Sequence, residues 1–315
     1  MRILFLHDNF PAQFGAFAQY LSSQGWETIF GTQRENVGLN GVKTFTYKPH
    51  REPSDNTHRY LRSFERATLC GQAVARSLLA LEKRNLKPEI VMAHSGWGPG
   101  LFVKDIWPDV SFAAYFEWFY RMDGADISYL NKHGDDRELD DVLSGQLRNA
   151  AILSDLANCD GAIIPTQFQK TQFPKKFHDY LTVLHDGIDT DYFSPKDKRD
   201  SVRQKFQLPP YAQVITYVAR GMEPYRGFPE FIRALEIIQK ENANAYAIIV
   251  GEDRVAYGRK LPPGESYKKK LLAECSLDSE RVIFTGLLPR DQYRDVLLLS
   301  DVHVYFTIPF VLSWS

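Results

Sequence analysis

Short apolar runs alternate with helical stretches along most of the chain, and this alternation predicts a parallel β-sheet covered on both faces by helices. The apolar runs that predict strands lie at residues 3–7, 27–31, 42–47, 89–94, 111–116, 161–165 and 180–184, and then at 213–219, 246–250, 281–285 and 302–306. Helical spacing is clearest at Phe14, Phe17, Ala18 and Leu21, and again at Tyr60, Phe64, Ala67, Gly71, Val74 and Leu78. The predicted fold class is therefore α/β.

A polar, turn-rich stretch at residues 185–200, HDGIDTDYFSPKDKRD, separates this alternation into two series. Such composition is typical of an interdomain connection. We predict two Rossmann-like domains with parallel sheets facing a cleft, formed by residues 1–192 and 193–315. The second series has only about four strand-like runs and ends in the apolar segment VHVYFTIPFVLSWS. Because an uncovered apolar end leaves an exposed patch, we expect further chain or a partner to cover it, so that the second domain is incomplete.

The composition, with 44% hydrophobic and 24% charged residues, is typical of a soluble globular protein. A formal net charge of −1 argues against nucleic acid or an anionic membrane as a bulk partner. The three cysteines have no metal-ligand spacing, which favours a reduced, cytoplasmic protein. The opening MRILFLHDNF predicts a first strand rather than a signal segment, and no window approaches the length of a membrane span.

Two arginines, Arg220 and Arg226, frame the loop between an apolar strand and an amphipathic helix in YVARGMEPYRGFPEFIRAL (217–235). A strand-to-helix turn presents unpaired backbone N–H groups and the positive end of the helix dipole. Guanidinium groups bind phosphate oxygens bidentately, so the loop suits a phosphate or diphosphate. The alternative is that both are surface arginines paired with Glu223 and Glu230.

A glycine-rich loop, MAHSGWGPG (92–100), follows another predicted strand. Its glycines allow the backbone to approach a ligand closely, and His94 ends the strand. A dinucleotide-binding fingerprint is a weak interpretation, because the spacing is G-x-G-x-G and the loop does not follow the first strand. The alternative for His94 is that it caps its own loop.

The aromatic-rich stretch YFEWFYRMDGADISY (115–129) contains candidates for binding a ligand, because its aromatic rings are interleaved with charged residues. We expect Tyr115 and Phe116 in the core, and Glu117, Tyr120 and Arg121 remain candidates for ligand contact.

The triplet Asp189-Thr190-Asp191 has the Asp-x-Asp form of a metal site, but it lies in the polar connection. We expect its aspartates to cap backbone N–H groups there. The segment YKKKLL (267–272) is typical of a solvated helix face.

Several segments together resemble the family 4 retaining glycosyltransferases with the GT-B fold. YVARGMEPYRGFPEFIRAL resembles the start of their C-terminal domain, with Ala219 in place of the usual Gly and Arg226 in place of the usual Lys. VLHDGIDTDYFSP (183–195) resembles the signature that closes their N-terminal domain. AIIVGED (247–253) and VIFTGLLPRDQY (282–293) resemble the next two strand-loop units, and MRILFLHDNFPAQFGAFAQYL resembles the first strand, loop and helix.

The resemblance implies site residues. Arg220 and Arg226 would hold the diphosphate of a nucleotide-sugar donor, and His94 would lie beside the transferred sugar; these three are the expected catalytic residues. The expected donor-binding residues are Gly15, Gly221, Gly251, Gly286 and Leu288. The candidates on the acceptor side are Glu117, Tyr120 and Arg121. The family's paired glutamates, seven residues apart, have no counterpart in IPFVLSWS, which puts the activity of the chain in doubt.

The implied function is metal-independent transfer of a hexosyl unit, with retention, from a nucleotide sugar to a glycan, a lipid or a small molecule. No cofactor and no metal are expected, and contact with the inner membrane face is possible. The alternatives are an inactive chain that binds only nucleotide or a partner, and a nucleotide-sugar epimerase of the same fold. The sugar, the base, the acceptor and the oligomeric state stay open.

Overall fold

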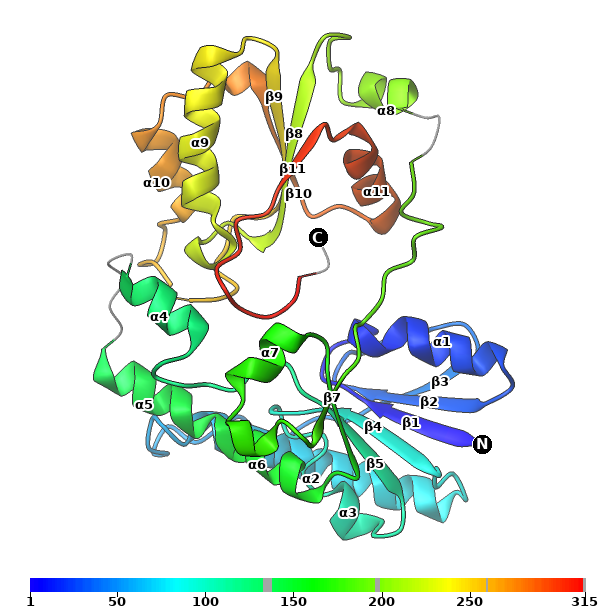
Figure 1. Cartoon of the computed structure of the whole chain (residues 1–315). Helices are drawn as coiled ribbons and strands as arrows, with labels where there is room; N and C mark the ends of the chain where they lie inside the picture. Colours follow the sequence, from blue (N-terminus) through cyan, green and yellow to red (C-terminus); the bar gives the residue numbers. More distant parts are fainter. Residues whose placement is uncertain (133–137, 196–198, 259, 314–315) are drawn as a thin grey trace. The chain divides into compact units, whose positions relative to one another are not determined.

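The computed structural model describes residues 1–132, 138–195, 199–258 and 260–313. The chain forms two compact units (Figure 1). The N-terminal unit consists of Met1–Asp186 with Phe310–Leu312, and the C-terminal unit of Gly187–Pro309 with the residues from Ser313. This division falls earlier in the connecting stretch than the boundary predicted after residue 192.

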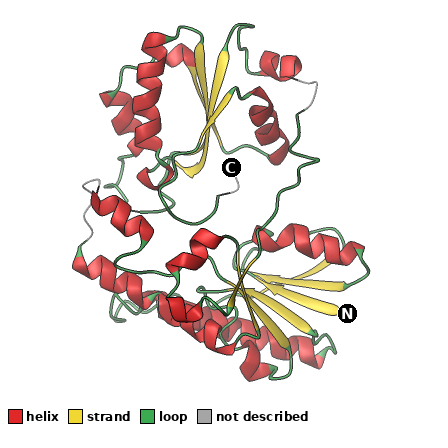
Figure 2. Ribbon diagram, in the orientation of Figure 1, coloured by secondary structure: helices red, strands yellow, loops and turns green. Residues whose placement is uncertain are grey.

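The N-terminal unit contains a seven-stranded parallel sheet with the order β3-β2-β1-β4-β5-β6-β7. Its strands are β1 (Arg2–Leu6), β2 (Glu27–Thr32), β3 (Val42–Thr46), β4 (Ile90–His94), β5 (Ser111–Tyr115), β6 (Gly161–Ile164) and β7 (Leu181–Val183). Its helices are η1 (Ala12–Phe14), α1 (Gly15–Ser23), α2 (Arg62–Lys83), α3 (Val103–Ile106), α4 (Ala125–Lys132), α5 (Leu139–Leu147), α6 (Asn149–Asn158), α7 (Gln167–Gln172) and η2 (Lys175–Phe177). Figure 2 shows helices on both sides of this sheet.

Two cores form because successive side chains of a strand point to opposite faces of the sheet. In β1, Leu4 and Leu6 join the core that includes α2 and α3, whereas Ile3 and Phe5 join the core that includes α1. A parallel strand with helices on both faces is therefore apolar at every position, as the run ILFL is.

The C-terminal unit contains a four-stranded parallel sheet with the order β10-β9-β8-β11. Its strands are β8 (Gln213–Gly221), β9 (Ala245–Glu252), β10 (Val282–Gly286) and β11 (Val302–Val304). Its helices are α8 (Arg199–Lys205), η3 (Pro224–Arg226), α9 (Phe228–Glu241), α10 (Tyr267–Glu274), η4 (Ser279–Arg281) and α11 (Arg290–Leu299).

This smaller sheet also separates two cores. On one face Tyr217 of β8 stacks on Phe231 of α9, with ring centroids 4.7 Å apart. On the other face Val214 and Ile248 pack with Val296 of α11. Both faces are covered, so the predicted α/β class with two parallel sheets is confirmed.

Each sheet contains one point where the strand order reverses. In the N-terminal unit β1 leads to β2 and β3 on one side, while β4 begins the other side. In the C-terminal unit β8 leads to β9 and β10 on one side, and β11 lies on the other. Ligands of open parallel sheets bind at the carboxyl ends of the strands beside such a reversal.

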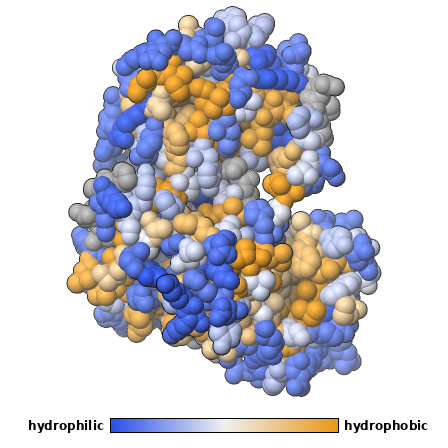
Figure 3. Space-filling view, in the orientation of Figure 1, coloured by the Kyte–Doolittle hydropathy of each residue, from blue (hydrophilic) through white to orange (hydrophobic). Residues whose placement is uncertain are grey.

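Figure 3 shows hydrophilic residues over much of the visible surface, with hydrophobic patches between them. In the part of the chain that the structure describes, no helix is long and apolar enough to cross a membrane.

Candidate functional site

Glycines allow the carboxyl ends of β8 and β9 and the loops that follow them to lie close together. A Cβ added at Gly251 would lie 1.9 Å from the carbonyl oxygen of Ala219, and the φ angle of Gly251 is +136°. A Cβ at Gly221 would lie 2.6 Å from the carbonyl oxygen of Arg254. Only glycine fits at Gly251, because both the space and the backbone angle exclude other side chains.

Arg226, in η3 beside the reversal between β8 and β11, carries a nearly buried charge. The residue is 8% exposed, and its guanidinium lies 5.1 Å from the centroid of the Tyr257 ring. Its Nη1 donates to Oγ1 of Thr307, which follows β11, at 3.4 Å. The carbonyl of Arg226 accepts the hydroxyl of Tyr217 at 2.9 Å, which holds the loop on the sheet. Within the described ranges, no carboxylate forms an ion pair with this guanidinium.

The predicted pairing of the arginines with Glu223 and Glu230 is absent from the described chain. Glu223 is buried, and its Oε2 accepts the backbone N–H groups of Ala256 and Tyr257, the latter at 2.9 Å. Burial raises the pKa of Glu223, while its bonds to the backbone and then the nearby charge of Arg226 oppose this rise. Arg220 is exposed at the end of β8, and among the described residues it has no ion pair either. Among the described residues neither guanidinium group therefore has a direct carboxylate contact, and that of Arg220 is also exposed to solvent.

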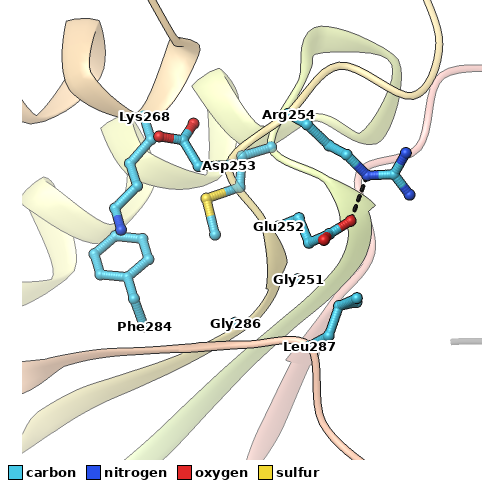
Figure 4. Close-up of a pocket in the computed structure, with 9 residues that line it drawn as sticks. Gly251, Glu252, Asp253, Arg254, Lys268, Phe284, Gly286 and Leu287 are labelled. Atoms are coloured by element: carbon cyan, nitrogen blue, oxygen red, sulfur yellow. Dashed lines mark ion pairs between the residues drawn. The ribbon is translucent and has the colours of Figure 1, made fainter.

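A hollow of about 480 Å³ opens at the carboxyl ends of β9 and β10 (Figure 4). It is lined by Met222, Gly251, Glu252, Asp253, Arg254, Lys268, Phe284, Gly286 and Leu287. In Figure 4 the side chain of Lys268 reaches the ring of Phe284, with its Nζ 3.9 Å from the centroid. Glu252 pairs with Arg254, whose Nε lies 2.5 Å from Oε2. The polar lining and the two glycines suit a small polar ligand.

Two predictions about this region change. Leu288 packs against the core around Val296, and its neighbour Leu287 lines the hollow instead. Lys268 was expected on a solvated helix face, but it contacts Phe284 and lines the hollow. The sequence pattern missed both because it does not show which side of a loop, or which face of a helix, lines a cavity.

In the N-terminal unit, His94 ends β4 and is 2% exposed. Its ring stacks on Trp97, with centroids 4.2 Å apart and planes 23° apart. Its Nε2 lies 3.4 Å from Oε2 of Glu117, while neither ring nitrogen has a hydrogen-bond partner among the described residues. The alternative that His94 caps its own loop is therefore wrong.

The loop after β4 is capped by Asp155 of α6 instead. Oδ2 of Asp155 accepts the hydroxyl of Ser95 at 2.7 Å and the N–H of Gly96 at 3.4 Å. Burial raises the pKa of Asp155 to about 6.

A second histidine, His7, follows β1 and was not among the predicted site residues. Its ring centroid lies 4.7 Å from that of His94. Nδ1 of His7 accepts the backbone N–H of Asn9 at 2.8 Å. Burial, and then the neighbouring His94, lower the pKa of His7 to about 2, so its ring is uncharged at neutral pH. Both histidines follow apolar runs, but only the strand order places β1 beside β4.

The other predicted residues of this unit occupy different places. Oε1 of Glu117 accepts the amide of Gln13, which brings Glu117 to the His94 group. Tyr120 packs against the core, with the guanidinium of Arg148 at 5.3 Å from its ring centroid. Arg121 pairs with Asp123, with 2.5 Å between Nη2 and Oδ2.

Gly15 begins α1, where an added Cβ would lie 2.5 Å from the Cβ of Pro11. This close approach explains a small residue there, and a donor contact of Gly15 stays a prediction.

Asp189 caps the connecting turn, as expected, because its Oδ1 accepts the N–H of Tyr192 at 2.9 Å. Its Oδ2 lies 3.6 Å from Nη2 of Arg290. In the described residues, no group of three or more His, Cys, Asp or Glu side chains is arranged to hold a metal ion.

Comparison with solved structures finds the same fold in several carbohydrate enzymes. Sucrose-phosphate synthase from Thermosynechococcus elongatus aligns with a TM-score of 0.69 at 12% identity, over 100% of this chain and 77% of that one. HepE from Anabaena, in complex with UDP and glucose, aligns with a TM-score of 0.66 at 15% identity, over 98% and 74%. The catalytic domain of starch synthase IV from Arabidopsis thaliana, bound to ADP and acarbose, aligns with a TM-score of 0.66 at 12% identity, over 99% and 79%. At these identities the likeness shows the fold, which is GT-B.

Comparison of the sequence with curated proteins found no match. A family model described as the Glycosyl transferase family 4 group matches residues 24–193, which is more than half of the chain. The chain therefore belongs to the glycosyl transferase family 4 group and is a glycosyltransferase with the GT-B fold.

Proposed function

We propose that this glycosyltransferase moves a hexosyl unit from a nucleotide-sugar donor to a glycan, lipid or small-molecule acceptor, with retention of configuration and without a metal ion. The diphosphate of the donor binds Arg220 and Arg226 beside the hollow at β9 and β10. We place its action in the cytoplasm, including the inner membrane face.

The observation that carries this proposal is the nearly buried guanidinium of Arg226, which has no carboxylate partner among the described residues. A nearly buried charge without a direct ion-pair partner is costly, so folding retains it where a ligand supplies the opposite charge. The place supports the same conclusion, because Arg226 and Thr307 lie at the carboxyl ends of β8 and β11, beside the reversal of strand order. The structural relative HepE is described in complex with UDP-glucose, which supports a nucleotide sugar as the donor class.

The arginines would act on the charge that develops during transfer. When the bond between the anomeric carbon and the phosphate oxygen breaks, negative charge collects on the departing diphosphate. Fixed cations there stabilise the transition state more than the ground state. In transfer with retention, the acceptor oxygen bonds to the same face of the sugar, and its proton passes to the departing phosphate oxygen.

The test is unfolding of the protein by heat in EDTA with UDP, GDP or ADP, followed by transfer assays with the matching nucleotide sugars. We expect one nucleoside diphosphate to raise the melting temperature by several degrees, and Arg226→Ala to abolish the rise. NMR of the product then gives the anomeric configuration. Stabilisation by none of the three nucleotides, or only after addition of a divalent cation, would contradict the proposal. Nucleotide binding without any transfer would show that the chain binds nucleotide but is catalytically inactive.

A further inference from the structure

Trp97 is the most exposed tryptophan among those that the structure describes. Its side chain is 38% exposed, whereas Trp107 and Trp118 are buried. One face of its indole is covered by the stacked ring of His94, and the ring of His7 meets it edge-on with centroids 5.2 Å apart. An aromatic ring that is supported on one side and still partly exposed offers its other side to a ligand.

The backbone holds Trp97 in place before any ligand binds. The flanking glycines have φ angles of +93° at Gly96 and +106° at Gly98. A Cβ at Gly98 would lie 1.9 Å from the carbonyl oxygen of Ala67, so this loop rests directly on α2. The bonds from Ser95 and Gly96 to Asp155 fix the other end of the loop. Holding the indole in advance reduces the entropy lost on binding.

Polar groups lie at the same edge of the sheet as the indole. Trp97 follows β4, Gln13 follows β1 and Glu117 follows β5, so three adjacent strands deliver them to one edge of the sheet. The Glu117 carboxylate lies 3.4 Å from His94, the ring on which Trp97 stacks, and it accepts the Gln13 amide. The reversal of strand order between β1 and β4 also lies here, which is where open sheets bind ligands.

This combination fits a sugar ring better than an anion. A pyranose has one face of C–H groups that packs on an aromatic ring, and hydroxyl groups at its rim that hydrogen-bond carboxylates and amides. The neighbouring His7 is uncharged at neutral pH, and the Glu117 carboxylate disfavours anions.

We propose that Trp97 is the platform of a pyranose-binding subsite in the N-terminal unit, with Glu117 and Gln13 binding the hydroxyl groups. The proposal rests on the proposed glycosyl transfer, because the sugar is either the unit being transferred or a ring of the acceptor. Trp97 is then a substrate-binding residue that a motif search for charged groups does not find.

The test uses saturation-transfer difference NMR on the full chain, with two sets of probes. The first is methyl β-glucopyranoside, methyl β-galactopyranoside and maltose, with glycerol as the negative control. The second is UDP-glucose, GDP-mannose and ADP-glucose, observed at their sugar protons. The variants are Trp97→Ala and Trp97→Phe, and the matched control is Tyr180→Ala, which removes a ring that is 71% exposed elsewhere in the same unit.

We expect wild type to saturate sugar protons of at least one probe, and Trp97→Ala to weaken that binding about tenfold or more. Trp97→Phe and Tyr180→Ala should retain most of it. A signal from the free glycosides indicates an acceptor ring, and a signal only from the nucleotide sugars indicates the transferred unit. Unchanged sugar binding in Trp97→Ala, or no saturation of any sugar in wild type, would refute the proposed role of Trp97 in sugar binding.

Thermal unfolding in the presence of nucleoside diphosphates tests the proposed donor site independently of the sugar subsite at Trp97. Trp97→Ala should keep the rise in melting temperature that depends on Arg226. If wild type binds sugars but no nucleotide, the platform stands and the donor site is wrong.

Discussion

Replacing Arg226 by methionine separates a binding role of this side chain from a structural one. Methionine is unbranched and flexible, so it can follow the path of the arginine stem through the same space. The substitution removes the charge, the contact with the Tyr257 ring and the bond to Thr307.

The structural loss is small. A cation over an aromatic ring contributes about 0.5–2 kcal/mol, and a hydrogen bond about 1 kcal/mol. The desolvation of a nearly buried guanidinium without a carboxylate partner among the described residues costs several kcal/mol and acts in the opposite direction. We therefore expect the free energy of unfolding of Arg226→Met, without ligand, to stay within about 1 kcal/mol of wild type or to rise.

The loss of binding is large. Two charge-assisted hydrogen bonds to a diphosphate contribute about 1.5–3 kcal/mol each, so their removal raises the Kd at least about a hundredfold. At a nucleotide concentration of about 100 times the wild-type Kd, wild type gains about 2.7 kcal/mol of stability. Under the same conditions the variant gains only about 0.4 kcal/mol.

Urea denaturation with and without the nucleoside diphosphate measures both effects on one protein. The matched control is Arg233→Met on α9, which removes an exposed arginine whose Nη2 lies 4.0 Å from Glu274. The control should keep the full gain. Arg226→Met that loses about 3 kcal/mol or more without ligand, yet keeps the wild-type gain with ligand, would refute the reasoning and make Arg226 a structural residue.

Three further predictions follow from particular contacts. Gly251→Ala should lower the free energy of unfolding by about 3 kcal/mol or more, because its Cβ would lie 1.9 Å from the Ala219 oxygen at a φ of +136°. Gly286 has a φ of +70° and no atom within 4 Å of an added Cβ, so Gly286→Ala should lower the free energy of unfolding by only about 1–2 kcal/mol. Equal losses for the two glycine variants in urea denaturation would show that the close contact at Gly251 does not matter. Burial raises the Asp155 pKa from 3.8 to about 6. Between these pH values the folded state holds a proton that the unfolded state has lost. The contribution of Asp155 to stability therefore falls as the pH rises. The unfolding free energy of wild type minus that of Asp155→Asn should thus fall by up to about 3 kcal/mol from pH 4 to 7, and a flat difference would show that Asp155 titrates normally. Transfer activity in EDTA should match activity in Mg²⁺ or Mn²⁺, and a strict requirement for either ion would show that the arginines do not suffice.

The strands were predictable from the sequence because strands buried on both faces appear as continuous apolar runs. Each of the predicted runs contains or overlaps a strand of the structure, from β1 (Arg2–Leu6) to the short β11 (Val302–Val304). The strand order was not predictable from this pattern, since apolar runs of the same kind do not indicate their neighbours. The position of His7 beside His94 depends on the pairing of β1 with β4, so the pattern that found His94 could not find His7.

The charged loop was predictable, but its partners were not. Arg220 and Arg226 stand out in sequence because two fixed charges interrupt an apolar strand and an amphipathic helix. Whether Glu223 neutralises them depends on side-chain direction, and in the structure Glu223 turns to the backbone of Ala256 and Tyr257. Leu287 and Leu288 illustrate the same limit, because a one-residue difference decides which side chain lines the hollow.

The side chains at the two reversals of strand order differ in charge. This difference corresponds to the charged diphosphate and the uncharged sugar rings of glycosyltransferase substrates. At the β8–β11 reversal the exposed and nearly buried guanidinium groups of Arg220 and Arg226 lack carboxylate partners among the described residues, which favours an anion. At the β1–β4 reversal the neutral ring of His7, the face of Trp97 and the Glu117 carboxylate favour an uncharged ligand with hydroxyl groups. A nucleotide sugar and its acceptor contain a diphosphate and uncharged rings. If the two reversals divide recognition in this way, Arg226→Met should weaken nucleotide binding with little effect on free sugars, and Trp97→Ala should do the reverse. Equal effects of both variants on both ligands would mean that neither reversal acts as a separate subsite.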